Sequence, residues 1–148
     1  MKFQTNRLEI KPITLNDKEY VLDLITNEIV GKTYMFPAFA SREAAEPLFQ
    51  RLVQLSEDDS RYVAGVYLDD RFIGIMNGVD IKEKQIEMGY AYLPDFYNRG
   101  YATEAFAGAI SYLHDHAVIL SQEYKDEYIE MNVELDEKYL YPIKAFVQ

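Results

Sequence analysis

A chain of 148 residues, 49% hydrophobic and 27% charged, has the composition of one soluble globular domain that can bury a core. Its net charge of −10 argues against binding to nucleic acid or to anionic membranes, since both need a basic face, and is compatible with a cationic partner. Without cysteine, an apolar run of about 18 residues or an apolar signal-peptide core at its start, the sequence predicts a cytoplasmic protein with no disulfide, thiolate metal site or membrane span.

The first part of the chain predicts a strand followed by a helix. Apolar residues alternate in NRLEIKPI, residues 6–13, which is the pattern of a strand with one buried face. Thr14 or Asn16 can then cap a helix, because either side chain can accept hydrogen bonds from free backbone N–H groups. Apolar residues recur at helical spacing over about residues 17–27, which sets the expected length of this helix.

A second helix is expected after the loop GKTYMFPAFAS, and the helical stretch opens at Ser41. Its apolar stripe consists of Ala45, Leu48, Phe49 and Leu52. Pro47 has no N–H group to donate and fits a helix best in the first turn. The regular helix is therefore expected to begin near Glu46.

Three strands are expected in the middle of the chain, at residues 61–68, 71–79 and 85–93. The tight turn Asp69–Asp70 joins the first two as an antiparallel hairpin. The third follows the charged turn DIKEK. Because side chains alternate along a strand, Glu87 and Ala91 are expected on one face of the third strand.

The strongest helix pattern in the chain runs from Thr103 to about Ala117. Thr103 can cap this helix, and Glu104 lies in its positively polarised first turn. EYIEMNVEL, residues 127–135, predicts a further strand. The resulting order, β-α-α-β-β-β-α-β, predicts an α/β domain with a largely antiparallel middle.

The segment PDFYNRGYATEA joins the third middle strand to this helix and has features of an anion-binding loop. A helix N-terminus presents unpaired N–H groups and a partial positive charge. Gly100 allows a ligand to approach the backbone closely, Ala102 is too small to obstruct it, and Arg99 adds a cation. Asn98 to Thr103 therefore form a candidate pyrophosphate cradle, with an ordinary strand-to-helix turn as the open alternative.

The longer segment LPDFYNRGYATEAFAGAISYL resembles the acetyl-CoA-binding motif of the GNAT superfamily of N-acyltransferases, Q/R-x-x-G-x-G/A. Gly100, Tyr101 and Ala102 match the G-x-A part. Tyr97 replaces the Gln or Arg, as in the branch that includes ribosomal-protein N-terminal acetyltransferases. The start, TNRLEIKPITLND, is similar to the T-x-R-L-x-L-R-P opening of that branch, so the resemblance spans residues 5–118.

This resemblance implies a GNAT-like single α/β domain over residues 1–148, with a mixed, mostly antiparallel sheet flanked by helices and an atypical, shortened or altered part at 119–148. It also implies that acetyl-CoA is the co-substrate and that no metal takes part. The acetyl group would pass directly, in a ternary complex, to a primary amine of a protein N-terminus, a polyamine or another small amine. Homodimers are common in this fold, so a homodimer is a further expectation.

The resemblance assigns roles to particular residues. Glu87 matches the carboxylate that often acts as the base, which the chemistry needs because an alkyl ammonium, with a pKa near 10.4, must lose a proton before it attacks. A solvated strand carboxylate is the alternative. Backbone groups of Ala91 to Leu93 would pair with the pantetheine arm. The cofactor-binding residues expected are thus Ala91, Tyr92, Leu93, Asn98, Arg99, Gly100, Tyr101, Ala102 and Thr103.

The family's general acid is commonly a tyrosine in a C-terminal segment that this chain does not match. Tyr139 and Tyr141 in YLYPIKAFVQ are the nearby candidates. This departure keeps two alternatives open, a non-catalytic acyl-CoA-binding relative and an unrelated tyrosine-rich interaction domain. His114 and His116 are two residues apart on the expected helix, so they point to different faces and form no metal pair.

Overall fold

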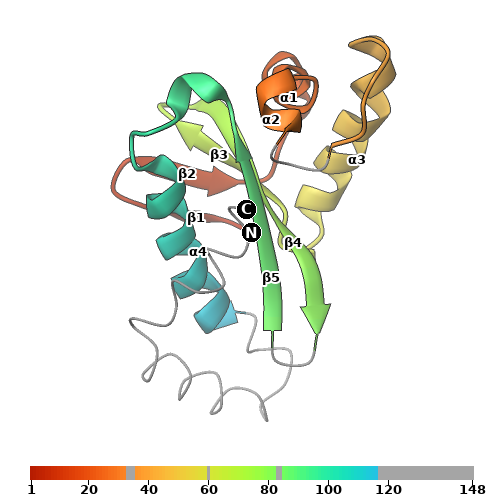
Figure 1. Cartoon of the computed structure of the whole chain (residues 1–148). Coiled ribbons are helices and arrows are strands. Elements are labelled where there is room, and N and C mark those ends of the chain that lie inside the picture. Colours follow the sequence, from red (N-terminus) through yellow and green to blue (C-terminus); the bar gives the residue numbers. More distant parts are fainter. Residues whose placement is uncertain (33–35, 60, 83–84, 117–148) are drawn as a thin grey trace.

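The computed structural model describes residues 1–32, 36–59, 61–82 and 85–116. Within them, the strands form one antiparallel sheet in which each strand pairs with the next one along the chain. The strand expected at 127–135 lies outside the described residues. The strands, drawn in Figure 1, are β1 (Phe3–Gln4), β2 (Leu8–Lys11), β3 (Ala64–Leu68), β4 (Arg71–Lys82) and β5 (Gln85–Tyr92).

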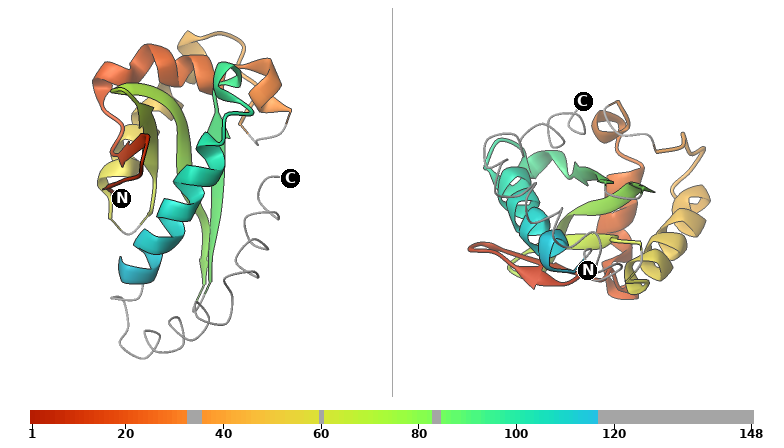
Figure 2. Two further views of the ribbon diagram at one scale, coloured as in Figure 1. Left: turned by 90° about the vertical axis from the view of Figure 1, so that its left-hand side faces the viewer. Right: turned by 90° about the horizontal axis from the view of Figure 1, so that it is seen from below.

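Helices cover both faces of this sheet and confirm the predicted α/β architecture. Three of them, α1 (Lys18–Ile25), α2 (Glu28–Gly31) and α3 (Glu46–Glu57), lie on one side. The fourth, α4 (Tyr101–His116), crosses the other side, and the view from below in Figure 2 shows the sheet between α3 and α4. Short 3-10 turns precede α1, α3 and the loop into α4, at Leu15–Asp17, Glu43–Ala45 and Pro94–Phe96.

A bulge in β4 decides which of its residues enter which core. The pairing of β3 with β4 slips by one residue at Ile73. As a result, Phe72 and Ile75 pack in the core beneath α1 and α3, whereas Ile73 and Met76 pack beneath α4. An uninterrupted alternation would have placed Ile73 and Ile75 on the same face. The bulge therefore lets this central strand supply large apolar side chains to both cores.

β5 keeps a regular alternation up to the point where the chain leaves the sheet. Met88 and Tyr92 pack beneath α4, while Ala91 and Leu93 pack on the side of α1 and α3. The alternation predicted for residues 85–93 is thus confirmed for these side chains. The last residues of β5 consequently have one aromatic face and one face of smaller side chains.

Two helix boundaries differ from the prediction. The first helix ends at Ile25 instead of continuing to Asn27, because Asn27 is the cap of α2. Its side-chain oxygen accepts hydrogen bonds from the N–H groups of Ile29 at 2.9 Å and Val30 at 3.2 Å. Helical spacing alone does not distinguish one helix from two short ones divided by such a cap.

The second boundary concerns the start of α4, which begins at Tyr101 and not at Thr103. The Glu104 N–H donates to the Gly100 carbonyl at 3.0 Å, so the first helical hydrogen bond closes three residues earlier than a Thr103 cap would allow. The expected end near Ala117 lies outside the described residues.

Other local predictions are confirmed. α3 begins at Glu46 with Pro47 in its first turn. Asp69 and Asp70 have positive φ angles of 49° and 65°, as a two-residue hairpin turn that follows the twist of its strands requires. Of the two predicted caps, Thr14 occupies the capping position of the 3-10 turn Leu15–Asp17, whereas the residue at the N-cap of α1 itself is Asp17.

Ser56 supplies the first test of how the elements are held together. Its side chain is 1% exposed, and its hydroxyl accepts the Ile13 N–H at 2.9 Å and donates to the Val53 carbonyl at 2.9 Å. Ser56→Ala would leave the Ile13 N–H buried without this acceptor, so we expect the free energy of unfolding to fall by about 1–3 kcal/mol in urea denaturation. Ser111→Ala, at an exposed position of α4, is the control and should change it by less than about 0.5 kcal/mol.

Candidate functional site

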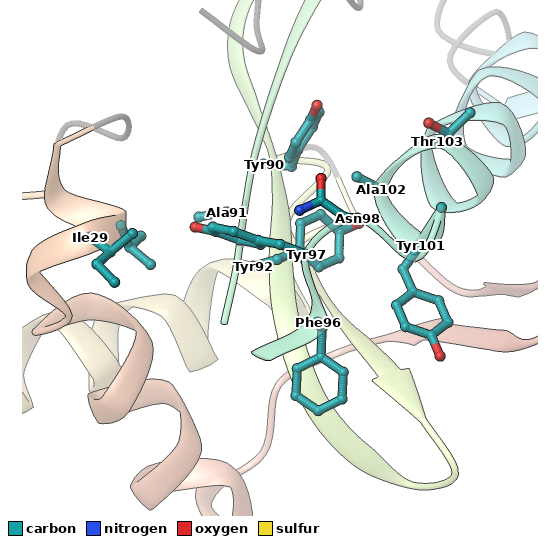
Figure 3. A pocket seen from close by; sticks show the side chains of 12 residues that line it. Ile29, Tyr90, Ala91, Tyr92, Phe96, Tyr97, Asn98, Tyr101, Ala102 and Thr103 are labelled. Carbon is teal, nitrogen blue, oxygen red and sulfur yellow. The ribbon is translucent and has the colours of Figure 1, made fainter. Parts of the chain in front are cut away.

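A cavity of about 430 Å³ lies where the end of β5, the start of α4 and the helix α2 meet. Figure 3 shows Ile29 of α2 on one side, the first residues of α4 on the other, and the tyrosines of β5 between them. The loop between β5 and α4 borders the same space. The lining consists of Ile29, Val30, Tyr90, Ala91, Tyr92, Phe96, Tyr97, Asn98, Gly100, Tyr101, Ala102 and Thr103.

The loop into α4 is sharply curved. After the 3-10 turn at Pro94–Phe96, Asn98 has a φ angle of 61° and Gly100 one of 81°, both in the left-handed region. Asparagine and glycine are the residues that adopt this region at least cost. The sequence NRG therefore suits the reversal that brings the chain from the sheet into the helix.

Backbone donors face the cavity at the start of α4. Because the first intrahelical hydrogen bond runs from Glu104 to Gly100, the N–H groups of Tyr101, Ala102 and Thr103 precede the helical ladder. All three residues line the cavity. Together with the positive end of the helix dipole, these donors suit a bound anion.

A segment from the beginning of the chain holds this loop in place. The Glu104 carboxylate accepts hydrogen bonds from the Thr5 hydroxyl at 2.5 Å, from the Arg7 backbone N–H at 2.9 Å and from the Arg7 Nε at 2.7 Å. The Arg7 Nη1 also donates to the Arg99 carbonyl at 3.0 Å. Its guanidinium lies over the Tyr101 ring, 4.5 Å from the centroid. Thr5 and Arg7, which lie between β1 and β2 and more than 90 positions away in the chain, are thus bonded to the loop and to the first turn of the helix.

Glu104 is ionised in this arrangement. Desolvation by burial disfavours the charged carboxylate, but the hydrogen bonds from Thr5 and Arg7 outweigh it and lower the pKa of Glu104 below its usual value. The sequence predicted only that Glu104 is a favourable charge at a helix N-terminus. In the structure, its carboxylate oxygens also accept hydrogen bonds from Thr5 and Arg7.

Tyr92 contributes a buried hydroxyl that the sequence pattern did not single out. The residue is 5% exposed, and its hydroxyl has no hydrogen-bond partner among the described residues. Burial raises the pKa of Tyr92, so the phenol is neutral. Its ring makes an edge-on contact with Tyr90, with centroids 5.6 Å apart, and Tyr90 in turn contacts Phe106 of α4.

Gly74 of β4 makes room for that ring. It pairs with Tyr92 across the sheet, and a Cβ at Gly74 would come within 2.6 Å of the Tyr92 ring and of the Ala91 carbonyl oxygen. A side chain at position 74 would therefore displace an aromatic residue of the cavity wall. Glycine in a strand is the signal that could have indicated such a close approach.

The backbone groups of β5 point alternately toward its two edges. The Leu93 N–H donates to the Ile73 carbonyl at 2.9 Å, which directs residue 93 toward β4. Because neighbouring residues of a strand direct their backbone groups to opposite edges, those of Tyr92 face away from β4. No strand within the described residues pairs with that outer edge of β5. The cavity is thus bordered by a strand edge whose outward backbone groups pair with no other strand in the described part of the chain.

The structure brings together most of the residues expected to bind a cofactor. The cavity lining includes seven of them and omits Leu93 and Arg99. Arg99 is exposed, and it takes part through its carbonyl, which accepts from Arg7. The structure does not describe the side chain of Glu87, although the backbone of Glu87 pairs with Asp80 in the sheet. Tyr139 and Tyr141 lie outside the described residues.

Among the residues that the structure describes, no three His, Cys, Asp or Glu side chains gather as a metal site would require. Within that part, no helix has the length and apolarity that a membrane crossing needs.

Comparison with known proteins gives a family match. The family described as acetyltransferase (GNAT) domain matches residues 7–135 of the chain. YoaA of Bacillus subtilis (strain 168), an uncharacterised N-acetyltransferase, is 26% identical over 113 residues. That alignment covers 74% of this chain and 64% of YoaA, so the chain spans less than two thirds of the length of this relative.

Solved structures share the fold at low sequence identity. A GNAT-family acetyltransferase from Bacillus anthracis superposes with a TM-score of 0.65 and 20% identity, over 79% of this chain and 68% of its own. RimL, a ribosomal L7/L12 α-N-protein acetyltransferase solved with coenzyme A, superposes with a TM-score of 0.62 and 12% identity. The superposition covers 77% of this chain and 68% of RimL. A spermidine N-acetyltransferase from Vibrio cholerae, solved with CoA and spermine, superposes with a TM-score of 0.61 and 16% identity. The superposition covers 75% of this chain and 66% of that enzyme.

The packing of Tyr92 against Gly74 can be tested by adding one methyl group. Gly74→Ala places a Cβ against the Ala91 carbonyl and the Tyr92 ring, so we expect the free energy of unfolding to fall by about 1–3 kcal/mol in urea denaturation. Gly31→Ala is the matched control, since its Cβ would meet no atom within 4 Å. Equal stability of the two variants would contradict the close approach at Gly74.

Proposed function

The chain belongs to the acetyltransferase (GNAT) domain family, and from this premise we propose that it transfers an acetyl group from acetyl-CoA to a primary amine. The observation that carries the proposal is the start of α4, where the curved loop leaves the N–H groups of Tyr101, Ala102 and Thr103 at a cavity. A helix N-terminus with such donors suits the pyrophosphate of CoA.

The rest of the cofactor has a matching surface in the same cavity. Residues Asn98 to Thr103 would hold the pyrophosphate, as the sequence motif predicts. The pantetheine arm contains amide groups, which can pair with a strand edge as another strand would. The outward-facing backbone of Tyr92 is the group of this segment best placed for that pairing, because the Leu93 N–H is already bonded to β4.

The proposed reaction is attack by a neutral amine on the thioester carbon. A carbon–nitrogen bond forms, the carbon–sulfur bond breaks, and its electron pair leaves with the sulfur of CoA. The acceptor ammonium must first lose one proton, which Glu87 would accept directly or through water. The proton that the nitrogen loses after the attack goes to the departing sulfur, so that CoA leaves as a thiol. A backbone N–H of β5 would stabilise the negative charge on the carbonyl oxygen in the transition state, as an oxyanion donor does.

A cationic acceptor is the class that we propose. The net charge of −10 favours the approach of amines, which are protonated at neutral pH. The spermidine N-acetyltransferase with the same fold was solved with spermine, a polyamine, and RimL is described as acting on a ribosomal protein. Both relatives support an amine acceptor, a polyamine or the N-terminus of a protein.

The proposal is tested in two stages. Calorimetric titration should show that the protein binds acetyl-CoA, and an assay of thiol release over a panel of polyamines, small amines and N-terminal peptides should then show turnover. Binding of acetyl-CoA without thiol release from any amine would instead support a non-catalytic acyl-CoA-binding protein. Absence of binding would contradict the proposal altogether.

The cradle at the helix start predicts a specific defect in cofactor binding. Gly100→Val adds a β-branched side chain at a position with φ of 81°, with its Cβ 3.3 Å from the Arg7 Nη2, so it strains the loop and shifts the backbone donors that would hold a phosphate. We expect the Kd for acetyl-CoA, measured by calorimetry, to rise by at least about tenfold. Ala107→Val, at an exposed position of the same helix, is the control and should leave the Kd unchanged. Unchanged affinity in the Gly100 variant would remove the cradle assignment.

The proposed base gives a complementary test, because it should affect turnover and not binding. Glu87→Gln removes the proton acceptor, so we expect kcat to fall by roughly 100-fold at neutral pH. The affinity for acetyl-CoA should barely change, since the carboxylate is not proposed to contact a phosphate. Glu57→Gln at the end of α3 serves as the control. If the Glu87 variant turns over at the normal rate, Glu87 is only a structural residue of the strand.

A further inference from the structure

Arg7 contacts the loop without lining the cavity that the loop borders. Its side chain is bonded to the Glu104 carboxylate and to the Arg99 carbonyl, and it covers the Tyr101 ring. One side chain thus fixes the residue before Gly100, the first residue of α4 and the first helical turn. A contact set of this kind restrains the shape of the loop and not only its position.

The bond to the Arg99 carbonyl sets the direction of a backbone donor. The carbonyl of residue 99 and the N–H of residue 100 belong to one planar trans peptide, in which the two groups point in opposite directions. Because the carbonyl points to the Arg7 Nη1 at 3.0 Å, the Gly100 N–H points away from Arg7. The Arg7 Nη2 also lies 3.3 Å from the place where a Cβ of Gly100 would stand, so the guanidinium packs directly against this turn.

The charge of Arg7 has a second effect. Glu104 places a carboxylate in the first turn of the helix whose N-terminus faces the cavity, and an unpaired carboxylate there would repel a bound anion. The Arg7 guanidinium and the Thr5 hydroxyl bind both of its oxygens. A second cation supports the loop further along, since Arg71 lies over Phe96, 5.3 Å from its centroid.

We infer that Arg7, with Thr5, positions the pyrophosphate-binding loop, so that the T-x-R segment between β1 and β2 acts in cofactor binding through Arg99 and Glu104. This inference rests on the proposed binding of acetyl-CoA. Arg7 is a positioning residue, since it contacts the loop and does not line the cavity. Its planar fork binds a carboxylate and a carbonyl at once, which the single ammonium group of lysine does not reproduce.

The test compares Arg7→Lys with Arg42→Lys. Like Arg7, Arg42 binds two partners, in its case the carboxylates of Glu19 and Asp23. These contacts do not involve the loop. Calorimetry measures the Kd of each protein for CoA and for pantetheine, which has the thiol arm but no pyrophosphate. For Arg7→Lys we expect the Kd for CoA to rise about tenfold and the Kd for pantetheine to stay within twofold. Arg42→Lys should change neither.

Several results would overturn the inference. It fails if Arg7→Lys binds CoA as tightly as the unaltered protein, or if CoA and pantetheine weaken equally, which indicates general damage to the fold. Should Arg7→Lys not fold, Thr5→Val, which removes the hydroxyl that donates to Glu104 and accepts the Leu8 N–H, must still weaken CoA binding relative to pantetheine. If the unaltered protein binds no CoA, both the proposed function and this inference fail. If the unaltered protein binds CoA and only the results for the Arg7 and Thr5 variants differ from those expected, the inference fails and the proposed function stands.

Discussion

The hydrogen bonds between Glu104 and the Thr5–Arg7 segment hold the two ends of the described fold together at the candidate site. The carboxylate lies in the first turn of α4, while Thr5 and Arg7 lie between the first two strands. Its location explains why α4, which packs over β1 and β2, begins where it does and why the preceding loop curves so tightly. Thr5 and Arg7 bind the carboxylate and the carbonyl that neighbour the backbone donors of the helix start.

The sheet contributes the second requirement of the site, a wall that ends in the outer edge of β5, with which no strand of the described residues pairs. A bulge at Ile73 lets β4 serve both cores, and Gly74, directly after it, leaves space for the Tyr92 ring. The last residues of β5 therefore bring an aromatic face beneath α4 and a less bulky face toward α2. The cavity lies where the chain leaves the sheet at the end of β5 and turns toward α4.

A comparison of the sequence-based predictions with the structure shows which signals are reliable. Elements with strong periodicity, such as the strands in the middle of the chain and the helix after Gly100, were predicted to within a few residues. Asn27 shows the limit, since it continues the helical spacing of α1 and yet caps α2. Seven of the nine residues expected at the cofactor site line one cavity, because the motif that suggested them is a continuous stretch of chain.

The sequence by itself determined the type of fold and the position of the glycine loop, since both follow from local patterns: alternation in strands, helical spacing, and residues that tolerate positive φ. Only the tertiary structure decided that Arg7 binds the carbonyl of Arg99, that Glu104 is bonded to Thr5, and that Tyr92 lies across Gly74. The physical reason is that these contacts join residues far apart in the chain. Their partners are set by the packing of the sheet against α4, which no local pattern encodes.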